Sequence, residues 1–416
     1  MKHIALFMHT LEGGGLQRIM LRLAGLFAAR GHRVDLVVCK AKGAFRLQVP
    51  AAVRLVPIER PYPRLAARVL AFGCAVAADP PALGRLLRPV LLARDPSPWF
   101  QRLPALTRYL RQAQPHALLS AGNTLNCVAL LARRLAGTST RLVVSERDNL
   151  SVFLGSRQGQ WRWRLLPPLI ARTYPWADAI VAVSDGVADD LARTAGLPRE
   201  RITTIYNPAL AEDDMRPEQT GHPWFAANAP PVVLGAGRLE EQKDFPTLLR
   251  AFARVRRQCP ARLIILGEGR RRAELEALAA RLQIGADVEL RGWVDNPYGY
   301  MRQAAVFVLS SIHEGLPNVL LEALACGCPV VSTDCPSGPA EILARGRYGA
   351  LAPVGDDAAL AQAILATLAA PPERAGLRAR AGQFSAEAAV ERYLEVLLGP
   401  CQLQPGDRLP RKRPCQ

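Results

Sequence analysis

Residues 232–266 read VVLGAGRLEEQKDFPTLLRAFARVRRQCPARLIIL, and this stretch sets the expected fold. A short apolar run leads into a polar loop, a segment of helical periodicity at 246–255 and a second apolar run at 262–266. This order is typical of a β-α-β unit. Residues 4–38 repeat it, with glycines after the first run and Gly31 ending the helix. The chain therefore begins the same kind of fold twice.

Further apolar runs alternate with helical patterns in both halves, which predicts an α/β protein with two Rossmann-like, doubly wound parallel sheets. Its 416 residues exceed what one hydrophobic core usually supports. We expect an N-terminal domain at 1–207, a linker at 208–230 that is rich in Pro, acidic and small residues, and a C-terminal domain at 231–383. A last helix at 384–400 should pack back toward the first domain, before a disordered basic tail at 401–416.

The chain is strongly basic, with 53 Lys and Arg against 36 Asp and Glu and a formal net charge of +17. Such a field attracts polyanions or an anionic lipid surface. Arginines interleaved with apolar residues at 60–111 suit an interfacial surface, or equally a set of solvated helix faces. No apolar stretch is long enough to span a membrane, so we expect peripheral contact at most. A nucleic-acid partner is not expected, because no stacking surface or nucleic-acid motif accompanies the arginines.

The nine cysteines are scattered through apolar runs, which fits reduced thiols in a cytoplasm. Cys326, Cys328 and Cys335 lack the second pair of ligands that a zinc site needs. The apolar run at the N-terminus breaks at His9 and leads into glycines, which predicts a first strand and not a signal peptide.

Two cations lie on the loop after the apolar run 232–236. Arg238 and Lys243 would stand at the carboxyl end of a strand and just before a helix, where ligands of parallel sheets bind. Such a pair can hold a diphosphate and stabilise charge on it as it leaves. An ordinary basic loop is the alternative.

A second constellation, HEGLPNVLLEALACG, occupies residues 313–327 after another apolar run. It predicts a helix with Pro317 in its first turn and Gly327 at its end. Glu314 would lie at the mouth of this helix, and Glu322 inside it would bind two ribose hydroxyls or pair with a buried arginine. The backbone expected to face a phosphate belongs to Gly315, Leu316, Pro317 and Asn318.

A glycine run, Gly13, Gly14 and Gly15, follows the first expected strand and precedes a helix. Bare backbone at this point can approach a donor phosphate or sugar closely. The run is not G-x-G-x-x-G, so it carries little information by itself.

Taken together, these strings resemble glycosyltransferase family 4. The match runs through Gly237-Arg238, Lys243, LGEG at 266–269, RGWV at 291–294, the two glutamates and GCPVVSTDCPSGPAEIL at 327–343. The first half matches more thinly, in GGGLQR, SERDN at 145–149, AVSDGV and YNP. The resemblance implies the GT-B fold, with two domains facing across a cleft, and transfer of a sugar with retention of anomeric configuration.

The resemblance also implies roles for matching residues. Arg238 and Lys243 would hold the diphosphate, Glu314 would face the donor sugar as a catalytic group, and Glu322 would hold the ribose. Gly267, Trp293 and Val294 would belong to the donor site, with the loop 291–294 lining the base. We expect a UDP-sugar in preference to a GDP-sugar and no metal, because no D-x-D pair is present.

One departure concerns the donor sugar. Many relatives have a histidine after the apolar run that corresponds to 117–119, where this chain reads SAGNTLN at 120–126. Asn123 or Asn126 would contact the sugar instead, and Glu146 and Arg147 of SERDN are further candidates for sugar or acceptor contact.

The SERDN and DCPSGPAEIL strings are most similar to enzymes that extend lipid-linked oligosaccharides or surface polysaccharides. We therefore expect an N-terminal domain that binds a glycolipid or polysaccharide acceptor, at the inner face of the cytoplasmic membrane. A sugar-nucleotide epimerase with the same fold and a non-catalytic membrane- or polyanion-binding scaffold are the alternatives. An epimerase would need acid/base groups around the sugar, and the chain has no suitable cluster of histidines for this. A scaffold would leave Glu314 and Glu322 unexplained.

Overall fold

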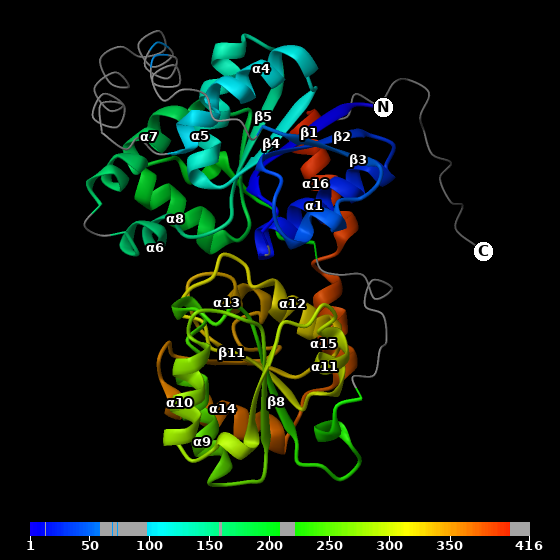
Figure 1. Cartoon of the computed structure of the whole chain (residues 1–416), viewed down its shortest axis with the longest axis vertical. Coiled ribbons are helices and arrows are strands. Elements are labelled where there is room, and N and C mark those ends of the chain that lie inside the picture. Colours follow the sequence, from blue (N-terminus) through cyan, green and yellow to red (C-terminus); the bar gives the residue numbers. More distant parts are fainter. Residues whose placement is uncertain are drawn as a thin grey trace, which may run out of the picture.

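The computed structural model describes residues 1–12, 14–58, 98–157, 160–208 and 221–399, with Val69 and Gly73. Within these residues two parallel sheets form, one from each half of the chain. Figure 1 shows the first half as the upper body and most of the second half as the lower one. The expected α/β architecture with two doubly wound domains is confirmed.

The N-terminal sheet has the described strand order β3-β2-β1-β4-β5-β6-β7. The chain crosses from one side of β1 to the other after β3, so the switch point lies between β1 and β4. The strands are β1 (His3–Thr10), β2 (Arg33–Lys40), β3 (Val53–Pro57), β4 (Ala117–Ala121), β5 (Arg141–Glu146), β6 (Ala179–Ala182) and β7 (Ile202–Thr204).

Helices cover both faces of this sheet. Alternate residues of β1 face opposite cores: Leu6 packs in the core that includes α1 residues, and Phe7 packs with residues of α4 and α5. The described helices are α1 (Gly15–Ala29), α4 (Leu103–Ala113), α5 (Asn123–Ala136), α6 (Leu150–Gly155), α7 (Leu166–Thr173) and α8 (Asp185–Ala195).

The C-terminal sheet repeats the design with the described order β10-β9-β8-β11-β12-β13. Its strands are β8 (Val232–Ala236), β9 (Arg262–Leu266), β10 (Val288–Gly292), β11 (Val306–Leu309), β12 (Val330–Thr333) and β13 (Ala350–Ala352). Its helices are α9 (Phe245–Arg256), α10 (Arg272–Arg281), α11 (Tyr298–Gln303), α12 (Asn318–Ala325), α13 (Pro339–Ile342), α14 (Asp357–Ala369) and α15 (Arg374–Gly382). Its switch point lies between β8 and β11.

The last helix, α16 (Ala386–Leu398), belongs in space to the first domain. Its buried residues Val390, Tyr393 and Leu397 share a core with Leu23 of α1 and Val143 of β5. In Figure 1 the helix rises beside α1 toward the upper sheet. The chain thus crosses between the domains a second time, between α15 and α16.

Several predictions fall outside the described residues. These are most of the arginine-rich segment, residues 209–220 of the linker, Gly13 and the basic tail. Among the described parts of the chain, no helix is long and apolar enough to cross a membrane. The exact domain boundaries stay predictions.

A buried carboxylate fixes the edge of the N-terminal sheet. Asp35 of β2 is fully buried and accepts hydrogen bonds from Nε of Arg54 on β3 at 2.8 Å and from the hydroxyl of Tyr109 on α4 at 2.7 Å. His3 Nε2 lies 3.0 Å from the same carboxylate. Burial acts to raise the pKa of Asp35, but the Arg54 and Tyr109 hydrogen bonds and His3 outweigh it, so the pKa lies below its ordinary value.

We expect Asp35→Asn to lower the free energy of unfolding at pH 7 by roughly 1.5–3 kcal/mol, the range for hydrogen bonds to a charged group. Because the folded pKa is depressed, this contribution is present above the unfolded pKa of about 3.9 and is lost as the pH falls through the folded value. Urea denaturation of both proteins between pH 7 and pH 3 measures it. A difference between them that does not shrink in acid would contradict this assignment.

Candidate active site

The loops after β8 and β11 meet at the switch point of the C-terminal sheet. Lys243 Nζ lies 2.5 Å from Oε1 of Glu314, and the Ser311 hydroxyl donates to the same oxygen at 2.7 Å. Glu314 is only 7 % exposed, so its charge is compensated inside the protein and not by water. The structure thus brings together two of the three residues predicted to be catalytic.

Further hydrogen bonds join the same two loops. The amide of Ile312 donates to the carbonyl of Gln242 at 2.9 Å, and Gln242 Nε2 donates to the carbonyl of His313 at 3.0 Å. The Ser310 hydroxyl donates to the carbonyl of Lys243 at 2.7 Å. Arg238, the third predicted catalytic residue, is exposed at the start of its loop. One cation is therefore held by Glu314, and the other is open to an anionic ligand.

Helix α12 carries the second glutamate. The helix begins at Asn318, one residue later than predicted, and the ring of Pro317 immediately precedes it. Glu322 is 5 % exposed, and burial raises its pKa although Arg18 acts in the opposite direction. Arg18 Nη1 lies 3.5 Å from Oε1, while Oε2 is buried and has no hydrogen-bond partner among the described residues. One oxygen of Glu322 therefore faces Arg18, whose side chain is 34 % exposed and so is not the buried arginine of the alternative. The contact of Glu322 with ribose hydroxyls stays a prediction.

The glycine turn of the N-terminal domain lies against the start of α12. A Cβ atom on Gly15 would stand 3.3 Å from Nδ2 of Asn318, so a side chain there would crowd the junction. Asn207 Nδ2 donates to Oδ1 of the same asparagine at 2.9 Å. Gly14 precedes α1 and has extended backbone. The carboxyl end of β1 and the start of α12 are thus neighbours, as the predicted donor site requires.

Gly267 has a packing role. Its amide donates to the carbonyl of Gly292 at 2.7 Å, and a Cβ atom on it would lie 2.0 Å from the carbonyl oxygen of Gly237. Only a glycine allows this approach, which supports the base of the Arg238 loop. Trp293 is 52 % exposed, with Nε1 donating to Asp295 at 2.9 Å, and Val294 packs half-buried against the core.

Two candidates for acceptor contact lie inside the N-terminal domain. Asn126 is fully buried and Glu146 is 2 % exposed. Asn126 Nδ2 donates to Oε1 of Glu146 at 3.1 Å, and the Tyr174 hydroxyl donates to the same oxygen. Burial raises the pKa of Glu146 to about 7, against the effect of the Tyr174 and Asn126 hydrogen bonds. A sugar could reach these two side chains only if the network opened, so that contact stays a prediction.

The other two candidates lie closer to the junction. Asn123 is half-buried at the start of α5. Arg147 follows β5, donates through Nη1 to Oδ1 of Asn207 at 2.8 Å and lies over the ring of Tyr393 at 5.9 Å. The guanidinium of Arg147 therefore ties β5 to the residue that holds Asn318 and to α16.

Several residues that join the domains had no predicted role, among them Arg18, Asn149 and Glu341. Each belongs to a string quoted for the family resemblance, GGLQR, SERDN or PSGPAEIL, and that membership was the available signal. Their partners, however, lie 304, 165 and 155 or 156 positions away in the sequence.

Within the described residues, no group of three or more His, Cys, Asp or Glu side chains is arranged to hold a metal ion. Cys326, Cys328 and Cys335 are buried free thiols.

Comparison with known families accounts for both halves of the chain. Residues 13–209 match the model described as Glycosyltransferase Family 4, and residues 230–370 match the model described as Glycosyl transferases group 1.

Similar proteins include an N-acetylgalactosamine-N,N'-diacetylbacillosaminyl-diphospho-undecaprenol 4-alpha-N-acetylgalactosaminyltransferase of Campylobacter jejuni. It is 28% identical over 88% of this chain and 89% of its own length. The lipopolysaccharide core biosynthesis glycosyltransferase LpsE of Rhizobium meliloti is 39% identical over 40% of this chain and 49% of its own length.

Among solved structures, HepE of Anabaena in complex with UDP-glucose superposes with a TM-score of 0.72 at 20% identity. The match covers 95% of this chain and 99% of that one. At this identity the likeness concerns the fold, and it agrees with the two facing Rossmann-like domains described above. From the two family models, which match its two halves, and the paired architecture, the chain is a family 4-like glycosyltransferase with the GT-B fold.

Proposed function

We propose that this enzyme transfers a hexose or N-acetylhexosamine from a UDP-sugar to a lipid-linked or polysaccharide acceptor, with retention of anomeric configuration. The observation that carries the proposal is the junction of the β8 and β11 loops. There the buried Glu314, on the loop that leads into α12, pairs with Lys243, and the β8 loop that carries Lys243 also carries the exposed Arg238. Glycosyltransferase membership weighs against the epimerase and scaffold alternatives.

In the proposed mechanism the diphosphate binds Arg238 and Lys243, beside the amides that begin α12. The two cations stabilise the leaving diphosphate as the bond to the sugar breaks, and Lys243 is already held at the site by Glu314. The acceptor hydroxyl attacks the anomeric carbon from the face that the diphosphate leaves. The leaving diphosphate accepts the proton of that hydroxyl. Glu314 faces the sugar and stabilises positive charge developing at its anomeric carbon. We propose that the two cations take the place of a metal.

The ribose of the donor is assigned to Glu322. A carboxylate at 5 % exposure with an unpaired oxygen carries an unmet demand for hydrogen-bond donors. Ribose hydroxyls are donors of the right kind, and Arg18 balances part of the charge from the other domain.

The acceptor and the nucleotide are proposed from similarity. The Campylobacter relative is named for an undecaprenol-diphosphate-linked sugar, and LpsE for lipopolysaccharide core biosynthesis. HepE was solved with UDP-glucose. The net charge of +17 suits an acceptor or a membrane face that is anionic, and we propose peripheral contact with the inner face of the cytoplasmic membrane.

Replacing the carboxylate of Glu314 tests the mechanism. We expect Glu314→Gln to fold, because the amide oxygen can still accept from Lys243 and Ser311, and to lower kcat by about 10²–10³, the usual loss for one preorganised electrostatic group. UDP release from a panel of UDP-hexoses and UDP-N-acetylhexosamines with a membrane lipid extract measures it. Glu276→Gln, an exposed glutamate on α10, is the matched control. Near-normal turnover of Glu314→Gln would refute the role.

A panel of UDP, GDP, ADP and CMP without metal tests the donor site. At about 100 times its dissociation constant, a nucleotide should add about 2.7 kcal/mol to the stability of the folded protein. We expect a rise in Tm with UDP that persists in EDTA and disappears in Arg238→Ala. Selective stabilisation by another nucleotide would change the assigned base, and a UDP shift that needs a divalent metal would contradict the metal-free mechanism.

The Glu322→Gln variant should change UDP affinity without lowering the stability of the unliganded protein. The wild-type carboxylate is buried with one oxygen unpaired among the described residues, and Arg18 and Arg22 only partly compensate its charge, so the neutral amide should leave the Tm of the unliganded protein unchanged or raise it. Loss of the hydrogen bonds from ribose should weaken UDP at least about tenfold in isothermal titration, the effect of about 1.4 kcal/mol. Unchanged affinity would remove Glu322 from the donor site.

A further inference from the structure

The N-terminal domain holds the loop that carries Glu314 by its backbone. Asn149, at the start of α6, donates through Nδ2 to the carbonyl of Glu314 at 2.9 Å. Ser184, before α8, donates through its hydroxyl to the carbonyl of Gly315 at 2.7 Å. Both donors are buried, at 2 % and 0 % exposure. Two successive peptide carbonyls of one domain are therefore fixed by two buried side chains of the other.

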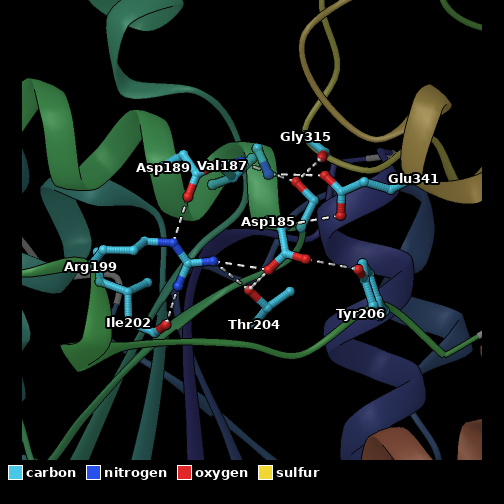
Figure 2. A network of polar contacts seen from close by, with 11 residues as sticks. Asp185, Val187, Asp189, Arg199, Ile202, Thr204, Tyr206, Gly315 and Glu341 are labelled. Atoms are coloured by element: carbon cyan, nitrogen blue, oxygen red, sulfur yellow. Dashed lines mark hydrogen bonds and ion pairs between the residues drawn. The ribbon is translucent and has the colours of Figure 1, made fainter. Parts of the chain in front are cut away.

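Glu341 makes the reciprocal contact from the C-terminal domain. Its carboxylate on α13 accepts hydrogen bonds from the amides of Asp185 and Gly186, each at 2.9 Å. These amides open α8, an eleven-residue helix, where backbone N–H groups lack partners within the helix and the helix dipole favours a negative charge. Figure 2 shows Glu341 reaching the start of α8 beside the carbonyl of Gly315.

Side-chain hydrogen bonds also hold the N-terminus of α8 in place. The Asp185 side chain accepts from Nη2 of Arg199 at 2.9 Å and from the Thr204 hydroxyl at 2.6 Å (Figure 2). Tyr206 lies in the first crossing between the domains, and its ring is 5.1 Å from that of Phe384 in the second crossing. The contact with Glu341 therefore lies next to both points where the chain passes from one domain to the other.

Two glycines show how closely the surfaces fit. A Cβ atom on Gly315 would lie 2.0 Å from the carbonyl oxygen of Arg147. One on Gly186 would lie 2.4 Å from Oγ and 2.7 Å from Cβ of Ser337. Gly186 lies in the first turn of α8 and has no positive φ, so lack of space, and not its backbone conformation, favours glycine there.

We propose that Asn149, Ser184 and the Asp185–Gly186 amides, closed by Glu341, form an interdomain clamp that positions Glu314 for transfer. Glu341 is a positioning residue, because it reaches α8 and not the reacting atoms. The clamp sets the Glu314 carboxylate relative to the domain proposed to carry the acceptor. This inference rests on the proposed function in assigning the reaction to Glu314.

Two variants open the clamp without touching the proposed donor site. Glu341→Gln keeps one acceptor oxygen but loses the charge that the α8 amides favour. Gly186→Ala is compatible with a helix and places a methyl group against Ser337. Gly155→Ala is the matched control, because it is also a helical glycine of the first domain and a Cβ atom there meets nothing within 4 Å.

We expect Gly186→Ala to lower kcat by up to roughly 10²-fold, the cost of a small misplacement of a catalytic group, with a smaller loss in Glu341→Gln. The Kd for UDP, measured by titration, should stay at the wild-type value in both variants, as should the kcat of Gly155→Ala. Hydrogen exchange followed by mass spectrometry should be slow over residues 184–187 in the wild type and faster in both clamp variants.

The outcomes separate the two proposals. Wild-type kcat and slow exchange in Gly186→Ala, with UDP still bound, would overturn the clamp. A loss of kcat accompanied by an equal loss of UDP affinity would also overturn it, since the defect would then lie in the donor site. Wild-type protein that binds no UDP would instead overturn the proposed function, while the exchange data would still decide whether the domains are held as described.

Discussion

The buried ion pair between Lys243 and Glu314 is the contact on which the rest of the site depends. A carboxylate taken out of water is costly unless nearby donors compensate it. Lys243 and Ser311 supply that compensation from two loops that follow adjacent strands, so the pair can form only if β8 and β11 are neighbours. The order of strands in the sheet and the need to compensate the buried carboxylate thus both place the β8 and β11 loops side by side. Asn149 and Ser184 of the first domain donate hydrogen bonds to the carbonyls of Glu314 and Gly315. The position of the Glu314 carboxylate therefore depends on how the two domains are placed relative to each other.

The elements of the fold could be predicted because their signals are local. Apolar runs of strand length followed by loops and helical periodicity marked β8, α9 and β9 closely. The meeting of Lys243 and Glu314 was also accessible, since each follows a strand whose direction the sequence indicates. The roles of Arg238 and Glu322 stay predictions. The start of α12 was missed by one residue, because Pro317 suits the residue before a helix as well as its first turn.

The relations between the domains could not be read from the sequence. Asn149 and Glu314 are 165 positions apart, and no periodicity connects them. Asn126 and Glu146 show a second limit. Both follow apolar runs and so were expected to face a ligand, yet side chains alternate along β5 and Asn126 lies on the face of α5 that packs on the sheet. The sequence predicts that a residue lies at the end of a strand. Whether its side chain faces the ligand site or the core depends on the helices that pack on the sheet there.

The distribution of charge gives a reason for this choice of buried residues. In a chain with a net charge of +17, anionic ligands are attracted to the whole surface, and attraction alone cannot fix where they bind. To select one anionic ligand among many, a site needs groups other than cations, such as buried hydrogen-bond acceptors. Glu314 and Glu322 are acceptors, both less than a tenth exposed; the first is paired with Lys243 and the second lies beside Arg18. In the proposed donor site, an anion without hydroxyl donors would gain nothing from these carboxylates, whereas the sugar and ribose of a nucleotide-sugar would supply hydroxyl donors to them. Burying two acidic groups costs stability, and under the proposed function the same two groups would let the site distinguish its donor from other anions.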